Sequence, residues 1–286
     1  MRRLPFDYAV RNLGRSRTRL ALSVVGSALV VLLTLTAGGF VRGMVTGLAG
    51  TGSAQNVILL GAGSEESIER SEVEASTAAI VAASVPGIAS SAGVLHVSSQ
   101  IHVQLPARIG ERDHVDDAPS ILVRGVGPEA LLVHEGVQIV EGRFPRPGWN
   151  EALIGEAVGD VLGVSRASLA PGATIDLGGT AWTVVGRFQA PRTVMGGEIW
   201  VDLDDLRVAT RRTTDSCVIV TLDKATFDDV DLFCKMRLDL ELVAMTESTY
   251  YDVLSRFFTP IRMVVIATAS LIALGGFLGG LNTMYA

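Results

Sequence analysis

The stretch that decides the fold is residues 20–41, LALSVVGSALVVLLTLTAGGFV, which runs for 22 residues without a charged side chain. A bilayer core about 30 Å thick is crossed by about 20 apolar residues of a helix that rises about 1.5 Å per residue. A second such stretch, residues 263–286 (MVVIATASLIALGGFLGGLNTMYA), has no charge over 24 residues. Between Arg42 and Arg262 no uncharged apolar run approaches this length. The sequence therefore predicts two transmembrane helices, over 20–42 and 261–286, with one large domain at 43–258.

A secretory signal peptide is the alternative for the first stretch, because it follows a basic N-terminus. The apolar core of a signal peptide has about 7–15 residues, fewer than are present here. The segment Thr36-Ala37-Gly38-Gly39 is also a weak match to a cleavage site. We therefore favour a membrane anchor.

Charge predicts the orientation of the chain. Residues 1–19 carry a net charge of +5, from Asp7 and the six arginines Arg2, Arg3, Arg11, Arg15, Arg17 and Arg19. The whole chain has a net charge of −6, so the remainder carries −11. Basic flanks stay on the cytoplasmic side of a membrane. We expect a multi-pass protein of the cytoplasmic (inner) membrane with a cytoplasmic N-terminus and an extracytoplasmic domain, whose second span returns the chain to the cytoplasm.

The basic leader before the first span has a helical pattern of its own. Over residues 5–18, Phe6, Val10 and Leu13 recur at helical spacing, and arginines occupy the other faces. Such a helix lies on a membrane surface with its apolar stripe at the headgroup boundary. We predict an amphipathic surface helix within residues 1–19, and the alternative is a disordered leader.

Small residues four positions apart mark the second span. Gly275 pairs with Gly279 in this way, and Gly276 pairs with Gly280. This spacing lets two helices approach closely in lipid. We interpret the four glycines as a helix-packing surface, and ordinary tolerance of glycine in membrane helices is the alternative.

The domain between the spans predicts a mixed α/β fold of the α+β class. Helices are expected over 65–84, 227–238 and 246–259. Strands are expected over 56–60, 94–105, 120–126, 152–154, 174–177, 181–188, 198–201, 217–222 and 240–245, with Gly178-Gly179 as a hairpin turn. We predict two lobes: a discontinuous strand–helix–strand lobe from 54–130 and 214–247, and an inserted β-rich lobe at about 140–205.

Motifs for chemistry are missing from the sequence. It has no P-loop, G-x-S-x-G or H-E-x-x-H motif. His96 and His102 share a strand face, but about 20 Å separates them, so they cannot hold one metal ion. We expect no enzyme, no cofactor, no metal and, given the acidic domain, no nucleic acid partner. Cys217 and Cys234 are either a disulfide or two buried thiols, and the sequence leaves both open.

Several segments resemble one known family in order and spacing. Residues 6–19 (FDYAVRNLGRSRTR) are similar to the cytoplasmic lead-in of MacB/FtsX/LolC-type ABC transporter permeases. Residues 275–286 (GGFLGGLNTMYA) resemble the second span of that family. The outer domain resembles the MacB-like periplasmic core domain at EGRF (141–144), NEALIG (150–155), PGATIDLGG (171–179), WTVVG (182–186) and EIWVDL (198–203).

The resemblance implies a permease subunit of the mechanotransmission type, which couples a separate cytoplasmic ABC-type ATPase to motion of an extracytoplasmic domain. It implies a homo- or heterodimer with a second permease subunit, and contact between the ATPase and the surface helix at Arg11, Arg15 and Arg17. The alternative is an FtsX-like regulator that activates an extracytoplasmic partner, and an anchored enzyme is a third, weaker reading. Family members normally continue into two further spans, so we interpret the chain as truncated after the second.

The inserted lobe is where we expect an extracytoplasmic adaptor or cargo to bind. Its far end should lie away from the membrane anchors, and binding residues concentrate on loops held by a rigid scaffold. The predicted contacts are exposed loop residues at the tip, and a plain β connection is the alternative reading of this segment. These contacts are Gln189, Arg192, Met195 and Glu198.

Overall fold

The computed structural model describes residues 17–110 and 118–285, with side-chain surroundings given for 21, 24–110 and 118–276. The chain divides into two units, residues 1–45 with 255–286, and residues 46–254. The predicted surface helix at 5–18 falls almost wholly outside the described residues, as do Arg11 and Arg15.

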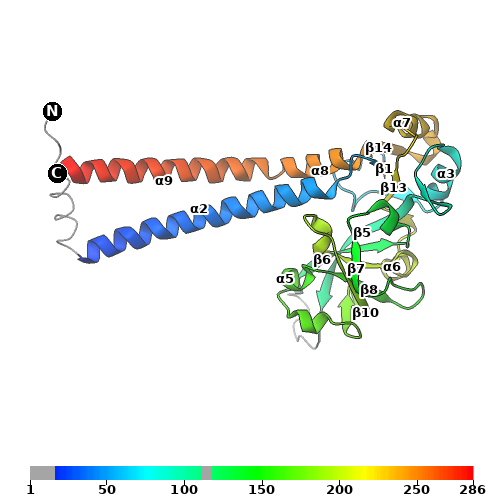
Figure 1. The fold of residues 1–286 in the computed structure, drawn as a ribbon, viewed down its shortest axis with the longest axis horizontal. Coiled ribbons are helices and arrows are strands. Elements are labelled where there is room, and N and C mark those ends of the chain that lie inside the picture. Colours follow the sequence, from blue (N-terminus) through cyan, green and yellow to red (C-terminus); the bar gives the residue numbers. More distant parts are fainter. Residues whose placement is uncertain (1–16, 111–117, 286) are drawn as a thin grey trace. The chain divides into compact units, whose positions relative to one another are not determined.

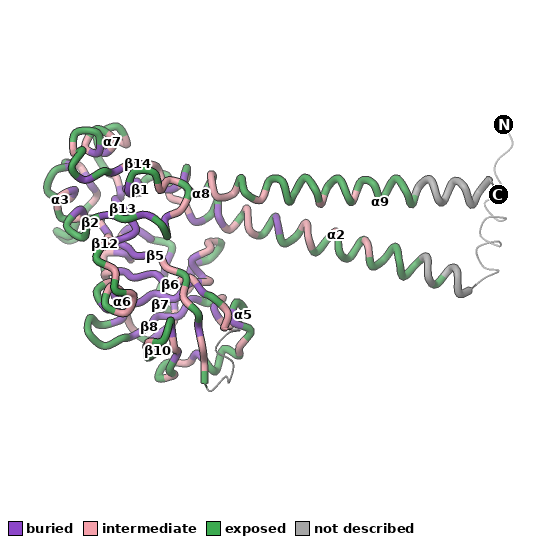
Figure 2. The backbone as a smooth tube through the Cα atoms, turned by 180° about the vertical axis from the view of Figure 1, so that it is seen from behind, coloured by how far each residue is buried: buried purple, intermediate pink, exposed green. Residues whose placement is uncertain are grey.

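The first unit consists mainly of two long apolar helices (Figure 1). They are α2 (Arg17–Thr51) and α9 (Thr259–Tyr285). Val24–Thr51 and Thr259–Gly276 are long and apolar enough to cross a membrane. Figure 2 colours most of their described residues as exposed, in contrast to the buried residues of the strands. Helix α2 therefore contains the predicted first span and continues beyond it to Thr51.

The glycine surface of the second span stays a prediction. A Cβ added at Gly275 or Gly276 would meet no described atom within 4 Å. These two positions are therefore open to a partner helix. Gly279 and Gly280 lie outside the residues whose side-chain surroundings are described.

In residues 46–254, the described strands build one mixed ten-stranded sheet. Nine lie side by side in the order β14 (Leu242–Thr246), β1 (Asn56–Gly61), β13 (Cys217–Thr221), β5 (Val97–Arg108), β6 (Ser120–Val126), β11 (Ile199–Asp202), β8 (Glu151–Gly155), β10 (Thr180–Gln189) and β7 (Gln138–Gly142). The tenth, β9 (Thr174–Leu177), pairs with both β10 and β5. This double pairing closes six strands, β5, β6, β11, β8, β10 and β9, into a ring.

Among the residues that the structure describes, three apolar cores follow from the alternation of side chains along these strands. The ring strands direct residues such as Ile121, Ile175 and Trp182 into one core. A second core, around Val57 and Val220, lies between β1, β13, β14 and the nearby helices. A third contains Phe188 and Trp200, which stack with ring centroids 4.9 Å apart. The ring includes β5 and β6, which lie outside the predicted limits 140–205, and the division into two lobes stays a prediction.

Short helices cover the sheet (Figure 1). They are α3 (Thr77–Ser84), α4 (Ala130–Val133), α5 (Val158–Leu162), α6 (Leu203–Thr210), α7 (Phe227–Met236) and α8 (Glu247–Arg256), with 3-10 turns η2 (Arg166–Leu169), η3 (Val194–Gly197) and η4 (Leu238–Leu240). The Asp202 carboxylate caps α6, and Thr226 forms a capping box at α7. Helix α7 packs on β14, and α6 packs on β5, β6 and β11.

Most predicted strands are confirmed, and Ser120–Val126 and Thr174–Leu177 agree to the residue. The hairpin at Gly178-Gly179 is also confirmed, because β9 and β10 pair in antiparallel fashion across it. The predicted helix over 65–84 is wrong, since helix is present at Thr77–Ser84 alone within that range.

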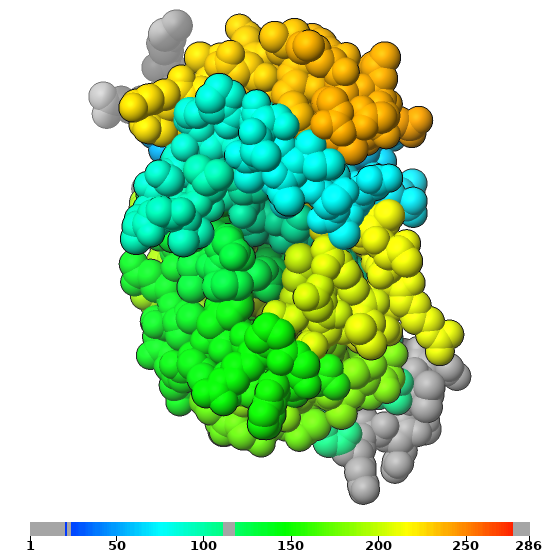
Figure 3. Space-filling model, turned by 90° about the vertical axis from the view of Figure 1, so that its right-hand side faces the viewer, coloured from blue at the N-terminus to red at the C-terminus, as the bar shows by residue number. Residues whose placement is uncertain are grey.

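Distant partners hold residues 65–76 in a non-helical form. The Tyr250 hydroxyl accepts the Ile68 amide, and Ser71 Oγ accepts the Gly61 amide. Val73–Glu74 forms β2, which pairs with β12 (Thr214–Asp215). Figure 3 shows these two chain regions side by side on the surface. A further small hairpin joins β3 (Ser90–Ser91) to β4 (Val94–Leu95).

Candidate functional site

A row of polar side chains crosses the outer face of the ring, opposite the apolar interior. Ile101, Val123 and Val201 face the ring core, so their chain neighbours face outward. His102 on β5 lies opposite Arg124 on β6. Arg124 in turn lies opposite Trp200 on β11. Strand register therefore gathers these groups at one place.

Arg124 and Glu198 form a fully buried ion pair at the centre of this row. Their side chains are 1% and 2% exposed. Arg124 Nε and Nη2 each donate to the carboxylate at 2.7 Å, and Trp200 Nε1 donates to the same carboxylate at 3.0 Å. Burial opposes the charge of Arg124, but the Glu198 carboxylate outweighs burial and raises the pKa of Arg124. Arg124 is therefore a fixed buried cation.

This cation orients Gln100 and, through it, His134, which follows α4. Arg124 Nη1 donates to Gln100 Oε1 at 2.8 Å, so the Gln100 amide nitrogen faces His134. That nitrogen lies 2.9 Å from His134 Nε2 and donates to it. The imidazole proton is thus assigned to Nδ1. Burial and then Arg124 lower the pKa of His134 well below its ordinary value, which keeps the ring neutral.

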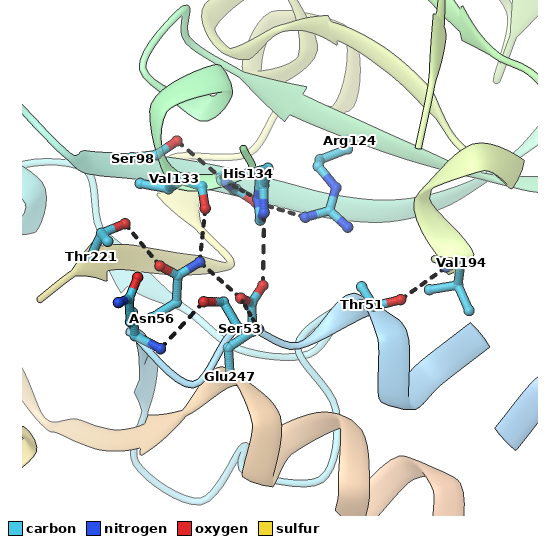
Figure 4. A network of polar contacts seen from close by, with 12 residues as sticks. Thr51, Ser53, Asn56, Ser98, Arg124, Val133, His134, Val194, Thr221 and Glu247 are labelled. Carbon is cyan, nitrogen blue, oxygen red and sulfur yellow. Dashed lines mark hydrogen bonds and ion pairs between the residues drawn. The ribbon is translucent and has the colours of Figure 1, made fainter. Parts of the chain in front are cut away.

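Glu247, the first residue of α8, ends the chain of contacts (Figure 4). Its Oε2 accepts the Ser53 amide at 3.0 Å and Asn56 Nδ2 at 2.8 Å. Its Oε1 lies 3.8 Å from His134 Nδ1 and has no hydrogen-bond partner among the described residues. Burial raises the pKa of Glu247, although the Ser53 and Asn56 bonds oppose the rise.

We call this set the junction network. Its members are Asn56, Gln100, Arg124, His134, Glu198 and Glu247. They come from β1, β5, β6, the residue after α4, the residue before β11, and α8. The network connects the sheet to both chain segments that lead to the apolar helices.

The two connections are also held tightly to each other. Ser53 follows α2, and its amide is bound by Glu247 at the start of α8. A Cβ added at Gly52 would lie 2.8 Å from Ser248 Cα and 2.9 Å from the Glu247 carbonyl oxygen. Glycine is required here because backbone approaches backbone closely.

A loop at 190–197 contacts the last turns of α2. Thr51 Oγ1 accepts the Val194 amide at 2.9 Å, and the Val194 side chain would touch a Cβ at Gly47 at 3.5 Å. A Cβ at Gly50 would overlap the Arg192 carbonyl oxygen. Arg192 itself has a φ of 63°, in the left-handed region. The loop is therefore shaped to the end of α2.

This contact corrects the predicted tip of the outer domain. The segment 189–198 is not a free tip, because its Val194 amide is bound by Thr51 within the same unit of the chain. Gln189 is half-buried and Arg192 is exposed, but Met195 and Glu198 are buried. Met195 packs with Phe188 and Trp200, and Glu198 binds Arg124. The expectation of exposed loop residues is wrong for these two, and a partner contact at the others stays a prediction.

The junction network is not evident from the sequence, although one of its residues stands out there. Ser120–Val126 (SILVRGV) is a buried strand with a single arginine in it. A charged residue within such a strand indicates a buried partner of opposite charge. The partner Glu198 lies 74 residues further along the chain, which the strand pattern does not reveal.

A pocket of about 260 Å³ lies beside the network. Glu247 and His134 line it together with the segment between α2 and β1, the segment after α4, and the 190–197 loop. Its lining residues are Gly50, Thr51, Gly52, Ser53, Gln55, Asn56, Val133, His134, Glu135, Gly136, Val137, Thr193, Met195, Thr221 and Glu247.

The two cysteines are separate buried thiols rather than a disulfide. Burial raises the pKa of Cys217, and it raises that of Cys234 to about 11. Both thiols are therefore protonated near neutral pH. Within residues 17–110 and 118–285, no three histidine, cysteine or acidic side chains are grouped to hold a metal ion.

Fold and site together define a mixed α/β domain between two apolar helices, with buried polar residues that tie the sheet to both helix connections. Residues 20–231 match the model of the MacB-like periplasmic core domain family. Because the match spans about three quarters of the sequence, the chain belongs to this family, whose members are ABC transporter permease subunits and not themselves enzymes. The chain is thus an inner-membrane protein with an extracytoplasmic domain.

One solved structure supports the fold, and a second is reported beside it. The periplasmic region of MacB from Actinobacillus actinomycetemcomitans aligns with a TM-score of 0.52 at 12% identity, over 72% of this chain and 94% of that one. The extracellular domain of the noncanonic ABC-type transporter YknZ from Gram-positive bacteria aligns with a TM-score of 0.49 at 14% identity, over 67% and 100%. No curated protein sequence gives a match.

Proposed function

We propose that the chain is a mechanotransmission subunit of an ABC transporter, which couples ATP hydrolysis by a separate cytoplasmic ATPase to motion of its extracytoplasmic domain. In this proposal α2 and α9 cross the membrane, the N-terminus is cytoplasmic, and a second permease subunit completes a dimer. The motion drives export or extraction of a substrate. Family membership and the charge asymmetry of the sequence support the arrangement.

The observation that carries the proposal is the junction network. Motion of a membrane helix reaches an outer domain if the connection between them is stiff. Here the segment after α2 and the start of α8 share one carboxylate, that of Glu247. The 190–197 loop adds a second contact with α2. Buried, hydrogen-bonded groups are costly to separate, so the junction resists independent movement of the two connections.

The test removes one member of the network. In the full chain reconstituted with its ATPase, Asn56→Ala deletes the donor to Glu247 and the acceptor for Thr221. We expect ATP hydrolysis to persist while the extracytoplasmic output per ATP falls at least fivefold. The matched control is Gln55→Ala, at the neighbouring exposed position. Equal output from both variants and the wild type would refute the coupling role.

One observation favours the alternative, an FtsX-like regulator that activates an extracytoplasmic protein. Helix α7 and the turn after it expose Leu232, Met236 and Leu238 by 55%, 73% and 79%. Leu232 and Met236 also line an apolar groove of about 370 Å³ beside Pro86. Exposed apolar patches are typical of protein interaction sites. If Leu232→Ser with Met236→Ser abolishes partner activation and leaves transport intact, the regulator reading is the correct one.

A further inference from the structure

We propose that the pocket at the junction binds a small organic cation that carries an ammonium group. This inference deepens the proposed function, because occupancy of the pocket would act on the junction network. It names a ligand class for a site formed by Glu247, His134 and the segments around them.

The pocket is small and lies where the helix connections meet. Its volume of about 260 Å³ is below the range of about 300–1,000 Å³ that is typical of sites for drug-sized ligands. The segment after α2 forms one wall, and residues 133–137 form another. Figure 4 shows His134 and Glu247 facing each other from different elements of the fold, while Thr51 points toward Val194. A ligand of a few heavy atoms fits this space.

The charges around the pocket favour a cation. Two carboxylates, Glu135 and Glu247, are among its lining residues, which include no lysine or arginine. His134, the other titratable group of the lining, is kept neutral by burial and by Arg124. A metal ion is a poor match, because the described residues contain no group of three histidine, cysteine or acidic side chains.

Glu247 lines the pocket, and one of its two carboxylate oxygens has no hydrogen-bond donor among the described residues. Its side chain is 1% exposed, and Oε2 already accepts two hydrogen bonds. Oε1 is buried and accepts none from the described residues. A buried carboxylate oxygen without a donor is destabilising. An ammonium group offers three donors and a positive charge, and Ser53 and Thr193 are also among the residues that line the pocket.

Binding at this carboxylate would change how the segment after α2 is held to the start of α8. Oε1 is enclosed, so an entering ammonium group must draw the Glu247 side chain toward the pocket. The Ser53 amide and Asn56 Nδ2 bind the other oxygen of the same carboxylate. Ligand and connections therefore compete for one group, and the ligand would loosen the hold of α8 on the segment after α2.

The experiment titrates n-butylammonium chloride into the full chain in lipid nanodiscs at pH 7.5 and constant ionic strength, by isothermal titration calorimetry. We expect saturable binding, and none with 1-butanol, which has the same size and no charge. Glu247→Gln should weaken binding at least tenfold, because it removes the charge and keeps the shape. Glu135→Gln, at the exposed rim, should change the affinity less than threefold.

Three results would overturn the inference: no saturable heat with n-butylammonium, equal binding of 1-butanol, or equal affinity in the Glu247→Gln variant. A thermal unfolding curve for each variant establishes that the domain is folded. Binding is measured without the ATPase, so a negative result leaves the coupling proposal standing. Conversely, loss of coupling would leave a positive binding result intact.

Discussion

Gly52→Ala is the sharpest perturbation that the junction offers. The new Cβ would lie 2.8 Å from Ser248 Cα, 2.9 Å from the Glu247 carbonyl oxygen and 3.0 Å from the Ser248 amide nitrogen. All three neighbours are backbone atoms, so no flexible side chain can move aside. Ordinary contact begins at about 3.4 Å, and the two connections must therefore separate by about 0.6 Å or more.

That separation determines how much folding stability the Gly52→Ala variant loses. The hydrogen bond from the Ser53 amide to Glu247 is 3.0 Å long, and stretching it to about 3.6 Å removes it. Overpacking costs about 1–3 kcal/mol, and loss of a hydrogen bond to a charged group costs about 1.5–3 kcal/mol. Alanine also lowers the conformational entropy of the unfolded chain, which stabilises the folded protein by about 0.4–1 kcal/mol. We expect a net destabilisation of about 1.5–5.6 kcal/mol.

Thermal unfolding of the full chain, followed by tryptophan fluorescence, measures this effect. A domain of this size loses about 2–4 °C of Tm per kcal/mol, so the midpoint should fall by about 3–22 °C. Gly47→Ala is the matched control, because its Cβ would make an ordinary contact of 3.5 Å with Val194. If Gly52→Ala melts at the same temperature as Gly47→Ala, the two connections are not in tight contact and the reasoning fails.

Three further predictions concern topology, the ATPase and pH. Cysteines are placed one at a time at Asn12 and Gly136, and intact cells are treated with an impermeant thiol reagent. Only the cysteine at position 136 should be labelled. Labelling at position 12 alone would show the opposite orientation. Charge reversal at Arg11, Arg15 and Arg17 should weaken co-purification of the ATPase at least fivefold in a variant that inserts with the wild-type topology. Undiminished co-purification would exclude a coupling role for these three residues. Burial and Arg124 lower the folded-state pKa of His102 and His134. As the pH falls below about 6.5, these histidines therefore bind protons in the unfolded chain before they do so in the folded chain. The free energy of unfolding should then fall by up to about 1.4 kcal/mol per pH unit for each histidine. The raised pKa of Glu247 partly opposes this fall. Denaturant titration at several pH values measures the slope, which His134→Gln should reduce.

Local pattern predicted the strands well, because alternation and turn residues are local properties. Ser120–Val126 is a short run rich in apolar and β-branched residues and Thr174–Leu177 precedes a glycine pair, and both agree with the structure. The helix expected over 65–84 failed for the opposite reason. Tyr250 and Gly61 bind residues 68 and 71, and the first of these partners lies 182 residues away. No local pattern contains such a contact.

The site was less accessible from the sequence than the fold. The predicted loop was placed from chain connectivity alone, which indicated a distant tip. The structure instead bends residues 190–197 back onto Thr51, 143 residues earlier in the chain. Met195 and Glu198 are buried because the loop faces the sheet rather than solvent. The junction network combines six elements of the fold, and sequence order alone does not bring them together.

Hydrogen exchange at the junction tests the central proposal most directly. The Ser53 amide is bound by Glu247 and the Val194 amide by Thr51. Exchange at both amides is measured in the reconstituted complex with the ATPase. If the junction carries ATP-driven motion, exchange in peptides spanning 51–57, 192–197 and 246–251 should change together on ATP binding. Exchange in the ring strand at 152–154, which lies in the ring core, should stay constant. Identical exchange at the junction with and without ATP would contradict mechanotransmission through this network.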